Sequence, residues 1–120
     1  MSKKILVVDD SATVRQQLRL ALAPEGYEVI EARDGAEGLE QMIQVVDLSM
    51  AICDVNMPVM DGIEMITRVR EKGLEIPLLM LTTEGQPSLI KKAKAAGAKG
   101  WIVKPFDAKL LVKAVQKLAK

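Results

Sequence analysis

Acidic, hydroxyl and ammonium side chains stand directly after four short apolar runs of this chain. The residues are Asp9, Asp10, Asp54, Thr82 and Lys104. Apolar runs of this length, bounded by turn residues, are typical of strands buried on both faces of a parallel sheet. Because ligands of an open parallel sheet bind beyond the carboxyl ends of its strands, we expect these five side chains to meet at one edge.

Three carboxylates in one place need a physical reason, because like charges repel. At 4 Å and an effective dielectric constant near 20, one such pair costs about 4 kcal/mol. The cluster relieves this repulsion either by raising a pKa or by holding a cation. Oxygen ligands without histidine or cysteine favour a hard ion, and the small number of protein ligands favours Mg²⁺ over Ca²⁺.

A Mg²⁺ ion that keeps several waters commonly binds phosphate as well. Lys104 then supplies a fixed positive charge for a phosphoryl oxygen, and Thr82 supplies a hydroxyl donor. Asp54 is the carboxylate left to act as a nucleophile and form an aspartyl phosphate. Taken singly, such residues are usually helix caps, solvated lysines or ordinary strand residues. The prediction therefore depends on their combination at four separate strand ends.

The segments that position this cluster alternate between strand-like and helix-like patterns. The apolar runs are Ile5–Val8, Val29–Ile30, Met50–Cys53, Leu78–Leu81 and Trp101–Val103. Helical faces between and after them consist of Val14, Leu18 and Leu22; Leu39, Met42, Ile43 and Val46; Ile63, Ile66 and Val69; and Leu110, Leu111, Val115 and Leu118. A weaker helical pattern covers Ser88–Ala96. The alternation predicts an α/β fold of five β-α units around a parallel sheet.

Turn and cap residues agree with these boundaries. Four residues precede helical patterns as N-cap candidates: Ser11, Asp34, Asp61 and Asp107. Four glycines follow helical patterns, where a left-handed residue commonly ends a helix: Gly26, Gly73, Gly97 and Gly100.

Length and composition limit the classes of protein. A chain of 120 residues, about half of them apolar, predicts one domain over residues 1–120. The absence of histidine excludes Ser-His-Asp and Cys-His catalysis. The single Cys53 cannot form an internal disulfide, so we expect a core thiol in a reducing compartment. Without a signal peptide or an apolar run of about 18 residues, we expect a cytoplasmic protein with no membrane span.

Charge is distributed unevenly along the chain. Residues 1–84 hold 8 basic and 15 acidic residues, a balance of −7, whereas residues 85–120 hold nine lysines and one acid, a balance of +8. The basic third is either a solvated helix face or a surface for an acidic partner. It contains no arginine, and the chain ends just after the last helical pattern, so we expect no DNA-binding domain.

Four motifs, in this order and spacing, resemble the receiver domain of two-component response regulators, in particular its stand-alone CheY-like form. They are "VVDDS", "DVNMPVMDG", "LTTEG" and "VKPF". The resemblance covers essentially the whole chain. It implies a doubly wound, flavodoxin-like five-stranded sheet of order 2-1-3-4-5 with five helices.

The same resemblance implies a function and its partners. The protein would be a phosphorylation-dependent signalling switch, a monomer that receives a phosphoryl group from a sensor histidine kinase and then changes its affinity for a downstream protein. It would catalyse only its own phosphotransfer and autodephosphorylation, and so would not be an enzyme that turns over a substrate. The "LTTEG" run and the stand-alone length favour chemotaxis among the possible two-component pathways.

The resemblance also assigns roles around the acidic cluster. Asp9 and Asp10 would hold Mg²⁺, one of them largely through water. Asp54 would be the phosphoacceptor and a metal ligand, and Asn56 would give its main-chain carbonyl to the metal.

Three further roles concern the response to phosphorylation. Thr82 would be the switch hydroxyl that turns toward the phosphoryl group. Lys104 would pair with the acceptor carboxylate or a phosphoryl oxygen, before a Pro105 that the family usually joins by a cis peptide. Trp101 occupies the switch aromatic position, where the family usually has Tyr or Phe.

Two other functions of an α/β fold fit the residues less well. A flavin- or nucleotide-binding module needs a loop rich in Gly or Ser/Thr after the first strand, whereas "DDSATVR" is acidic and no GxGxxG motif occurs. A Mg²⁺ phosphohydrolase with an aspartyl intermediate wants a second acid two residues after the nucleophile, where this chain has Asn56.

Overall fold

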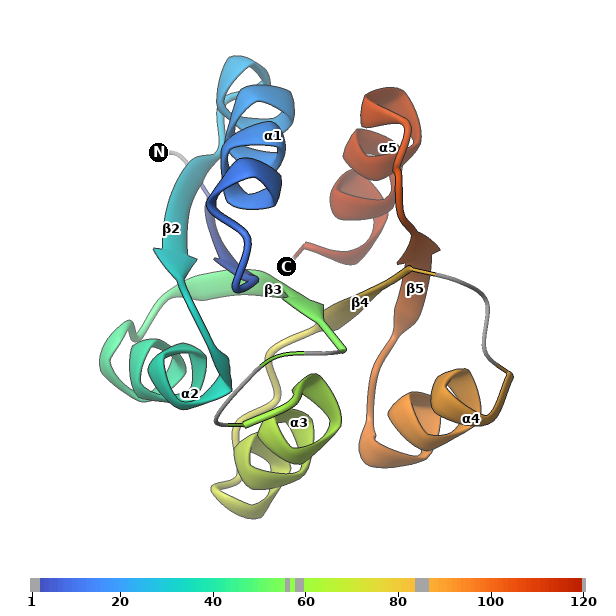
Figure 1. The fold of residues 1–120 in the computed structure, drawn as a ribbon. Coiled ribbons are helices and arrows are strands. Elements are labelled where there is room, and N and C mark those ends of the chain that lie inside the picture. The colour runs from blue at the N-terminus through green and yellow to red at the C-terminus, as the bar shows by residue number, and fades with distance from the viewer. Residues whose placement is uncertain (1–2, 56, 58–59, 84–86, 120) are drawn as a thin grey trace.

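A computed structural model describes residues 3–55, 57, 60–83 and 87–119 of the chain. Strands and helices alternate along these residues (Figure 1). The strands are β1 (Lys4–Val8), β2 (Glu28–Ala32), β3 (Leu48–Asp54), β4 (Leu78–Thr82) and β5 (Gly100–Val103). The helices are α1 (Ala12–Leu22), α2 (Gly35–Gln44), α3 (Gly62–Glu71), α4 (Pro87–Ala96) and α5 (Ala108–Leu118), with a short 3₁₀ helix, η1 (Ala23–Glu25), after α1. The predicted β-α units are confirmed in number and order.

The strands form one parallel sheet in the order β2-β1-β3-β4-β5, which confirms the order that the resemblance implies. The chain runs from β1 outward to β2 and then crosses back to β3 on the other side of β1. This reversal places the carboxyl ends of β1 and β3 side by side, with Val8 paired to Cys53. The residues that follow these two strands therefore share the crevice where such sheets bind ligands.

Helices cover both faces of the sheet, α1 and α5 on one side and α2, α3 and α4 on the other (Figure 1). Ile5 and Val7 pack with apolar residues of α1 and α5. Leu6 and Val8 pack with those of α2, α3 and α4. Both faces of β1 are thus buried, which explains why its sequence is continuously apolar rather than alternating.

Capping residues begin and end most of these helices where the sequence predicts. The side chains of all four N-cap candidates accept hydrogen bonds from main-chain N–H groups of the first turn: Ser11, Asp34, Asp61 and Asp107. Gly26, Gly73 and Gly97 have positive φ. The prediction for Gly100 is wrong, because this residue begins β5 instead of ending a helix.

Three apolar residues that the helical spacing assigned to the core are exposed. Ile43 and Leu110 are each at least half exposed, and Val46 is almost fully exposed. Val46 lies beyond the end of α2 at Gln44, so the helical spacing no longer applies to it. Leu110 lies next to the buried Leu111 on α5 and points away from the sheet.

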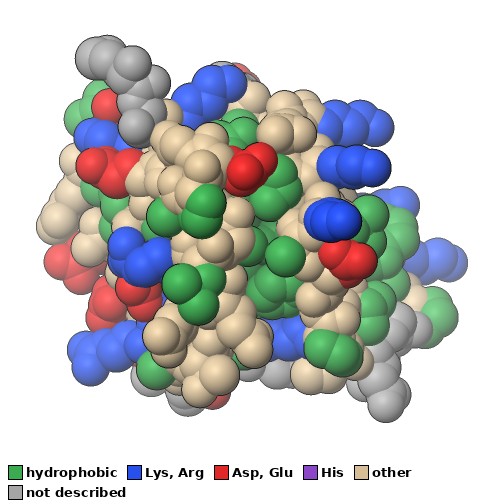
Figure 2. All heavy atoms as spheres, turned by 90° about the horizontal axis from the view of Figure 1, so that it is seen from above, with side chains coloured by type: hydrophobic (Ala, Val, Ile, Leu, Met, Phe, Trp, Pro, Cys, Tyr) green, Lys and Arg blue, Asp and Glu red, His purple; other side chains and the backbone are tan. Residues whose placement is uncertain are grey.

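The face formed by α1 and α5 carries a shallow furrow between the two helices. In Figure 2 apolar side chains fill this furrow and basic side chains gather on its right, the side of α5 in Figure 1. Leu20, Ala21 and Phe106 are among the residues that line it. None of the helices in the described part of the chain has the length and apolar character needed to cross a membrane.

Candidate functional site

The three predicted carboxylates meet at the carboxyl edge of the sheet. One oxygen from each of Asp9, Asp10 and Asp54 lies within 4.8 Å of the other two. Asp9 directly follows β1 and Asp54 ends β3, so the parallel pairing of these strands brings the two residues together. Asp9 is fully buried and Asp54 is 5% exposed, whereas Asp10 is exposed to solvent.

Both the side chain and the main chain of Asp9 form hydrogen bonds. Its Oδ1 accepts a hydrogen bond from the main-chain N–H of Ser11 at 2.9 Å, and its Oδ2 accepts one from Lys104 Nζ at 2.8 Å. Its main-chain N–H donates to the carbonyl of Ala32 at 3.1 Å. Its own carbonyl accepts from Arg15 Nη1 at 2.6 Å. A buried carboxylate needs such partners, because burial without them would disfavour its charge.

Lys104 bridges two of the three acids. Its Nζ lies 2.8 Å from Asp9 Oδ2 and 3.3 Å from Asp54 Oδ2. Burial lowers the pKa of Lys104, but the hydrogen bond to Asp9 and the charge of Asp54 more than offset this, so the pKa is raised above its usual value. The peptide bond between Lys104 and Pro105 is cis, as the resemblance implies. The Lys104 ammonium thus lies beside the Asp54 carboxylate, the candidate acceptor.

Thr82 ends β4, and its side chain is buried close to the same edge. Its main-chain carbonyl accepts from the N–H of Lys104 at 2.6 Å, which ties the end of β4 to the residue after β5. Within the described residues, its hydroxyl is a buried polar atom without a hydrogen-bond partner. Such an orphan hydroxyl costs stability, so its presence beside the cluster is consistent with a partner that arrives as a ligand.

Trp101 lies on the surface of β5 rather than in the core, with 38% of the residue exposed. The ammonium of Lys94, on α4, sits over its indole ring. Trp101 lines a narrow apolar pocket, too small for a water molecule, together with Thr82 and Ala93. The switch pair predicted from the resemblance is therefore joined by one pocket.

The loop after β3 is described only in part. Asn56, the predicted main-chain ligand, lies outside the described residues. Gly62 begins α3 and approaches the site closely: a Cβ on it would lie 2.4 Å from the Asp54 carbonyl oxygen. Its main-chain N–H donates to the Val55 carbonyl at 2.9 Å.

Sequence reasoning missed two residues of this site, Gly62 and Arg15. Gly62 stands inside a motif, directly after the cap Asp61, where a glycine needs a reason. Arg15 is a basic residue one turn into the helix that starts beside the acidic pair. Neither pattern by itself shows which atom the residue contacts.

The donor set fits a hard divalent cation. All three groups offer carboxylate oxygens, and within the described residues no histidine or thiol competes at this edge. Each carboxylate oxygen has two lone pairs. Asp9 therefore retains acceptor capacity beside its bonds from Ser11 and Lys104.

Comparisons with known proteins agree with this geometry. The profile of the family described as "Response regulator receiver domain" matches residues 5–116. The chain is 41% identical over 111 residues to "Chemotaxis protein CheY1" of Helicobacter pylori, covering 90% of each sequence. It is 35% identical over 118 residues to "Chemotaxis protein CheY" of Bacillus subtilis, covering 98% of each.

Solved structures give the same result. The crystal structure of the chemotaxis protein CheY4 of Vibrio cholerae, at low pH, matches with a TM-score of 0.92 and 42% identity, covering 98% of this chain and 99% of that one. A putative response regulator from Chloroflexus aurantiacus matches with a TM-score of 0.91 and 37% identity, covering 98% of each chain. Sequence, fold and site together show that the chain belongs to the response regulator receiver domain family.

Proposed function

We propose that the protein is a phosphorylation-dependent signalling switch in which Asp54 accepts a phosphoryl group from a histidine kinase. The observation that carries this proposal is the position of the Lys104 ammonium, 3.3 Å from the Asp54 carboxylate and inside a cluster of three acids. A nucleophilic oxygen beside a fixed cation is the arrangement that phosphoryl transfer requires, because catalysis of this reaction is mainly positioning and charge stabilisation.

In the transfer, a carboxylate oxygen of Asp54 attacks the phosphorus of a phosphohistidine. An O–P bond forms, the P–N bond breaks, and the leaving imidazole takes a proton from water. Lys104 stays protonated, since its pKa is raised, and pairs with an oxygen of the transferred group. A small phosphodonor such as acetyl phosphate would react in the same way, with acetate as the leaving group.

Asp9, Asp10 and Asp54 are the residues that would hold Mg²⁺, with the main-chain oxygen of Asn56 as a further predicted ligand. When bound, this ion supplies positive charge that offsets the charge on the phosphoryl oxygens. The chain would catalyse only this transfer and the hydrolysis of its own aspartyl phosphate.

The response to phosphorylation would start at Thr82. A phosphoryl group offers three acceptor oxygens where a carboxylate offers two. The buried hydroxyl of Thr82 is an unsatisfied donor within the described residues, so rotation about χ1 toward the new oxygen gains it a partner. Trp101 shares a pocket with Thr82 and would follow this movement.

The output would be a changed affinity for a protein partner. Exposed lysines of α4 and α5 favour a partner with an acidic surface; they are Lys91, Lys92, Lys94, Lys109, Lys113 and Lys117. Because the relatives are named as chemotaxis proteins, we propose a chemotaxis pathway. We also propose that residues 1–120 form one domain, since a single sheet takes in every strand of the described chain.

Labelling with acetyl phosphate and Mg²⁺ tests the phosphoacceptor. Intact-mass measurement should show one added phosphoryl group on the wild-type protein and none on Asp54→Asn. Asp61→Asn is the matched control, because the side chain of Asp61 caps α3 in the described part of the chain and asparagine caps equally well. Full labelling of Asp54→Asn would contradict the proposal and would direct attention to Asp10.

A further inference from the structure

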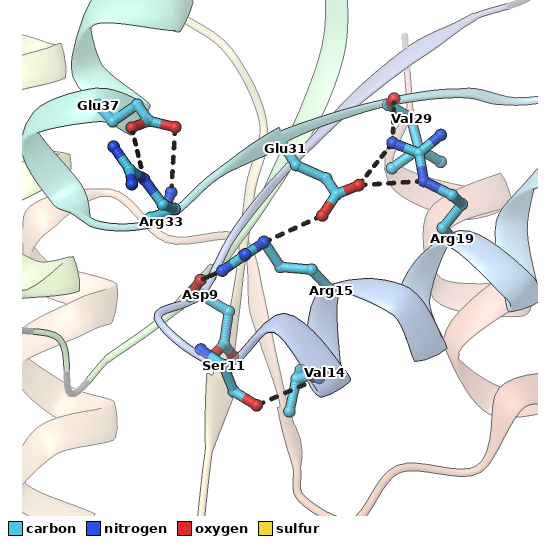
Figure 3. Close-up of polar contacts among 9 residues, drawn as sticks. All are labelled: Asp9, Ser11, Val14, Arg15, Arg19, Val29, Glu31, Arg33 and Glu37. Carbon is cyan, nitrogen blue, oxygen red and sulfur yellow. Dashed lines mark hydrogen bonds and ion pairs between the residues drawn. The ribbon is translucent and has the colours of Figure 1, made fainter.

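Two arginines of α1 hold Glu31 of the edge strand β2 between them (Figure 3). Arg15 Nε lies 3.0 Å from Glu31 Oε1. Arg19 donates to Glu31 Oε2 from Nη2 at 2.7 Å and from Nε at 3.1 Å, and its Nη2 also donates to the carbonyl of Val29. Both carboxylate oxygens of Glu31 are therefore engaged, and the two guanidinium groups are fixed relative to β2.

Arg15 extends this network to the acidic pair. Its side chain is only 12% exposed, and its Nη1 donates to the main-chain carbonyl of Asp9 at 2.6 Å (Figure 3). The two contacts use different nitrogens of one planar group, Nε for Glu31 and Nη1 for Asp9. A guanidinium can span two acceptors in this fixed way, whereas a lysine ammonium is a point donor on a flexible stem.

The carbonyl that Arg15 holds belongs to the peptide unit that joins Asp9 to Asp10. This unit is planar, so fixing its oxygen also fixes the direction in which the chain enters Asp10. Asp9 has further anchors through Ser11, Lys104 and Ala32. Asp10 is exposed, and no hydrogen bond of its side chain is found within the described residues. Its position therefore depends on the main chain on either side of it: the Asp9–Asp10 peptide, which Arg15 holds, and Ser11, which caps α1.

We propose that Arg15 is a positioning residue for the acidic pair, held in place by Glu31 and Arg19. Within the described residues its side-chain hydrogen bonds go to Glu31 and to the Asp9 carbonyl, so it acts by fixing the Asp9–Asp10 peptide. Residues that orient metal ligands without binding the metal themselves commonly have such a role, and their loss lowers metal affinity by about 10–100-fold. The inference rests on the proposed function, since it takes Asp9 and Asp10 to be the metal-binding pair.

A purely structural role would give a different result. In that case the network would only fasten α1 to β2, and its loss would lower stability without changing metal affinity. The chain offers a matched control for this case. Arg33 and Glu37 form another arginine–glutamate pair, 3.2 Å apart, that joins the end of β2 to α2. Among the residues drawn in Figure 3, no hydrogen bond or ion pair links this pair to Asp9.

The test compares four proteins: wild type, Arg15→Lys, Glu31→Gln and the control Glu37→Gln. Calorimetric titration with Mg²⁺ alone gives the dissociation constant of each, and denaturant unfolding without Mg²⁺ gives its stability. We expect Arg15→Lys to bind Mg²⁺ about tenfold more weakly than the wild type. Glu31→Gln should weaken binding in the same direction by a smaller factor, and Glu37→Gln should match the wild type.

A second measurement does not require the metal. The amide resonance of Asp10 in ¹H–¹⁵N spectra without Mg²⁺ should shift in Arg15→Lys and in Glu31→Gln, and stay in place in Glu37→Gln. At saturating Mg²⁺, acetyl phosphate should label Arg15→Lys as fully as the wild type, because Asp54 and Lys104 are unchanged.

Two outcomes would overturn the inference, and they are distinguishable from each other. Wild-type affinity for Mg²⁺ in both Arg15→Lys and Glu31→Gln would reduce the network to a structural fastening while leaving the proposed function intact. Failure of the wild-type protein itself to bind Mg²⁺ would remove the metal from the proposed function and the positioning role with it. If Arg15→Lys does not fold, the result from Glu31→Gln decides.

Discussion

The ammonium of Lys94 lies 4.3 Å from the centroid of the Trp101 indole ring. Such a contact at an exposed site contributes about 0.5–1 kcal/mol. It favours the position of Trp101 on the surface and so opposes its inward movement. A charge-assisted hydrogen bond from Thr82 to a phosphoryl oxygen contributes about 1.5–3 kcal/mol. The hydrogen bond of Thr82 is the larger of these two energies, and it favours the inward position of Trp101. Because the two energies differ by little, phosphorylation should shift the equilibrium between the two positions of Trp101 rather than lock one of them.

Trp101 is the only tryptophan, so its fluorescence reports this equilibrium directly. Adding beryllofluoride and Mg²⁺, which together mimic the phosphoryl group, should shift its emission to the blue and reduce acrylamide quenching. The shift should be absent in Thr82→Ala and larger in Lys94→Ala, because alanine cannot reach the indole ring and so removes the opposing contact.

Lys91→Ala is the control for this experiment, since Lys91 is an exposed lysine on the same helix. It should behave as the wild type. Unchanged emission in the wild-type protein would mean that Trp101 stays in place, and signalling would then have to proceed through Thr82 and the surrounding loops.

Asp9 and Asp10 should respond in opposite ways to neutralisation in the absence of Mg²⁺. Asp10→Asn removes repulsion at an exposed position and should stabilise the fold by about 1 kcal/mol, the energy of two charges 4 Å apart in water. Asp9→Asn takes a charged acceptor from Lys104 and should destabilise the fold by about 1.5–3 kcal/mol. Urea midpoints without Mg²⁺ measure both changes. Destabilisation by Asp10→Asn would show that this carboxylate supports the fold.

The ion pairs of Glu31 with Arg15 and Arg19 should make part of the free energy of unfolding depend on pH. Hydrogen bonds from Arg19, and then from Arg15, hold the pKa of Glu31 below its usual value of 4.5 despite partial burial. A carboxyl with a lowered folded-state pKa stabilises the fold above its unfolded pKa, and this stabilisation is lost as the pH falls through the folded value. Glu31→Gln should therefore unfold more easily at pH 7 by about 0.5–1 kcal/mol.

Urea midpoints of Glu31→Gln and the wild type between pH 7 and pH 3 check this expectation. The difference between the two proteins should close as the pH falls below 4.5. A constant difference over that range would show that the charge of Glu31 is not what the arginines recognise.

The fold was predictable because its signals are local. Apolar runs placed the five strands to within about two residues, and each predicted cap side chain accepts its helix N–H bond. Asp54, Thr82 and Lys104 were singled out for a related reason: each stands where a strand ends, and the parallel topology brings strand ends together. The strand order itself came from the family resemblance, since the spacing of the runs does not specify which strands are neighbours.

The missed features depend on tertiary placement. The sequence treats Asp9 and Asp10 as equivalent, whereas the structure buries one and exposes the other. Arg15 reaches Glu31 on β2 with Nε while its Nη1 contacts the Asp9 carbonyl, and no spacing rule gives this combination of contacts. Val46 has the helical spacing of a core residue, but α2 ends before reaching it.

The bond between Lys104 and Asp9 joins residues that are 95 positions apart in the sequence. β5 must therefore add to the edge of the sheet before Lys104 reaches the acids, and contacts of such long sequence separation are the ones that close late and at the largest loop entropy. During synthesis from the N-terminus, the carboxylates emerge well before the cation that neutralises them. The site is therefore complete only after β5 has joined the sheet, because only then does Lys104 reach the carboxylates of Asp9 and Asp54.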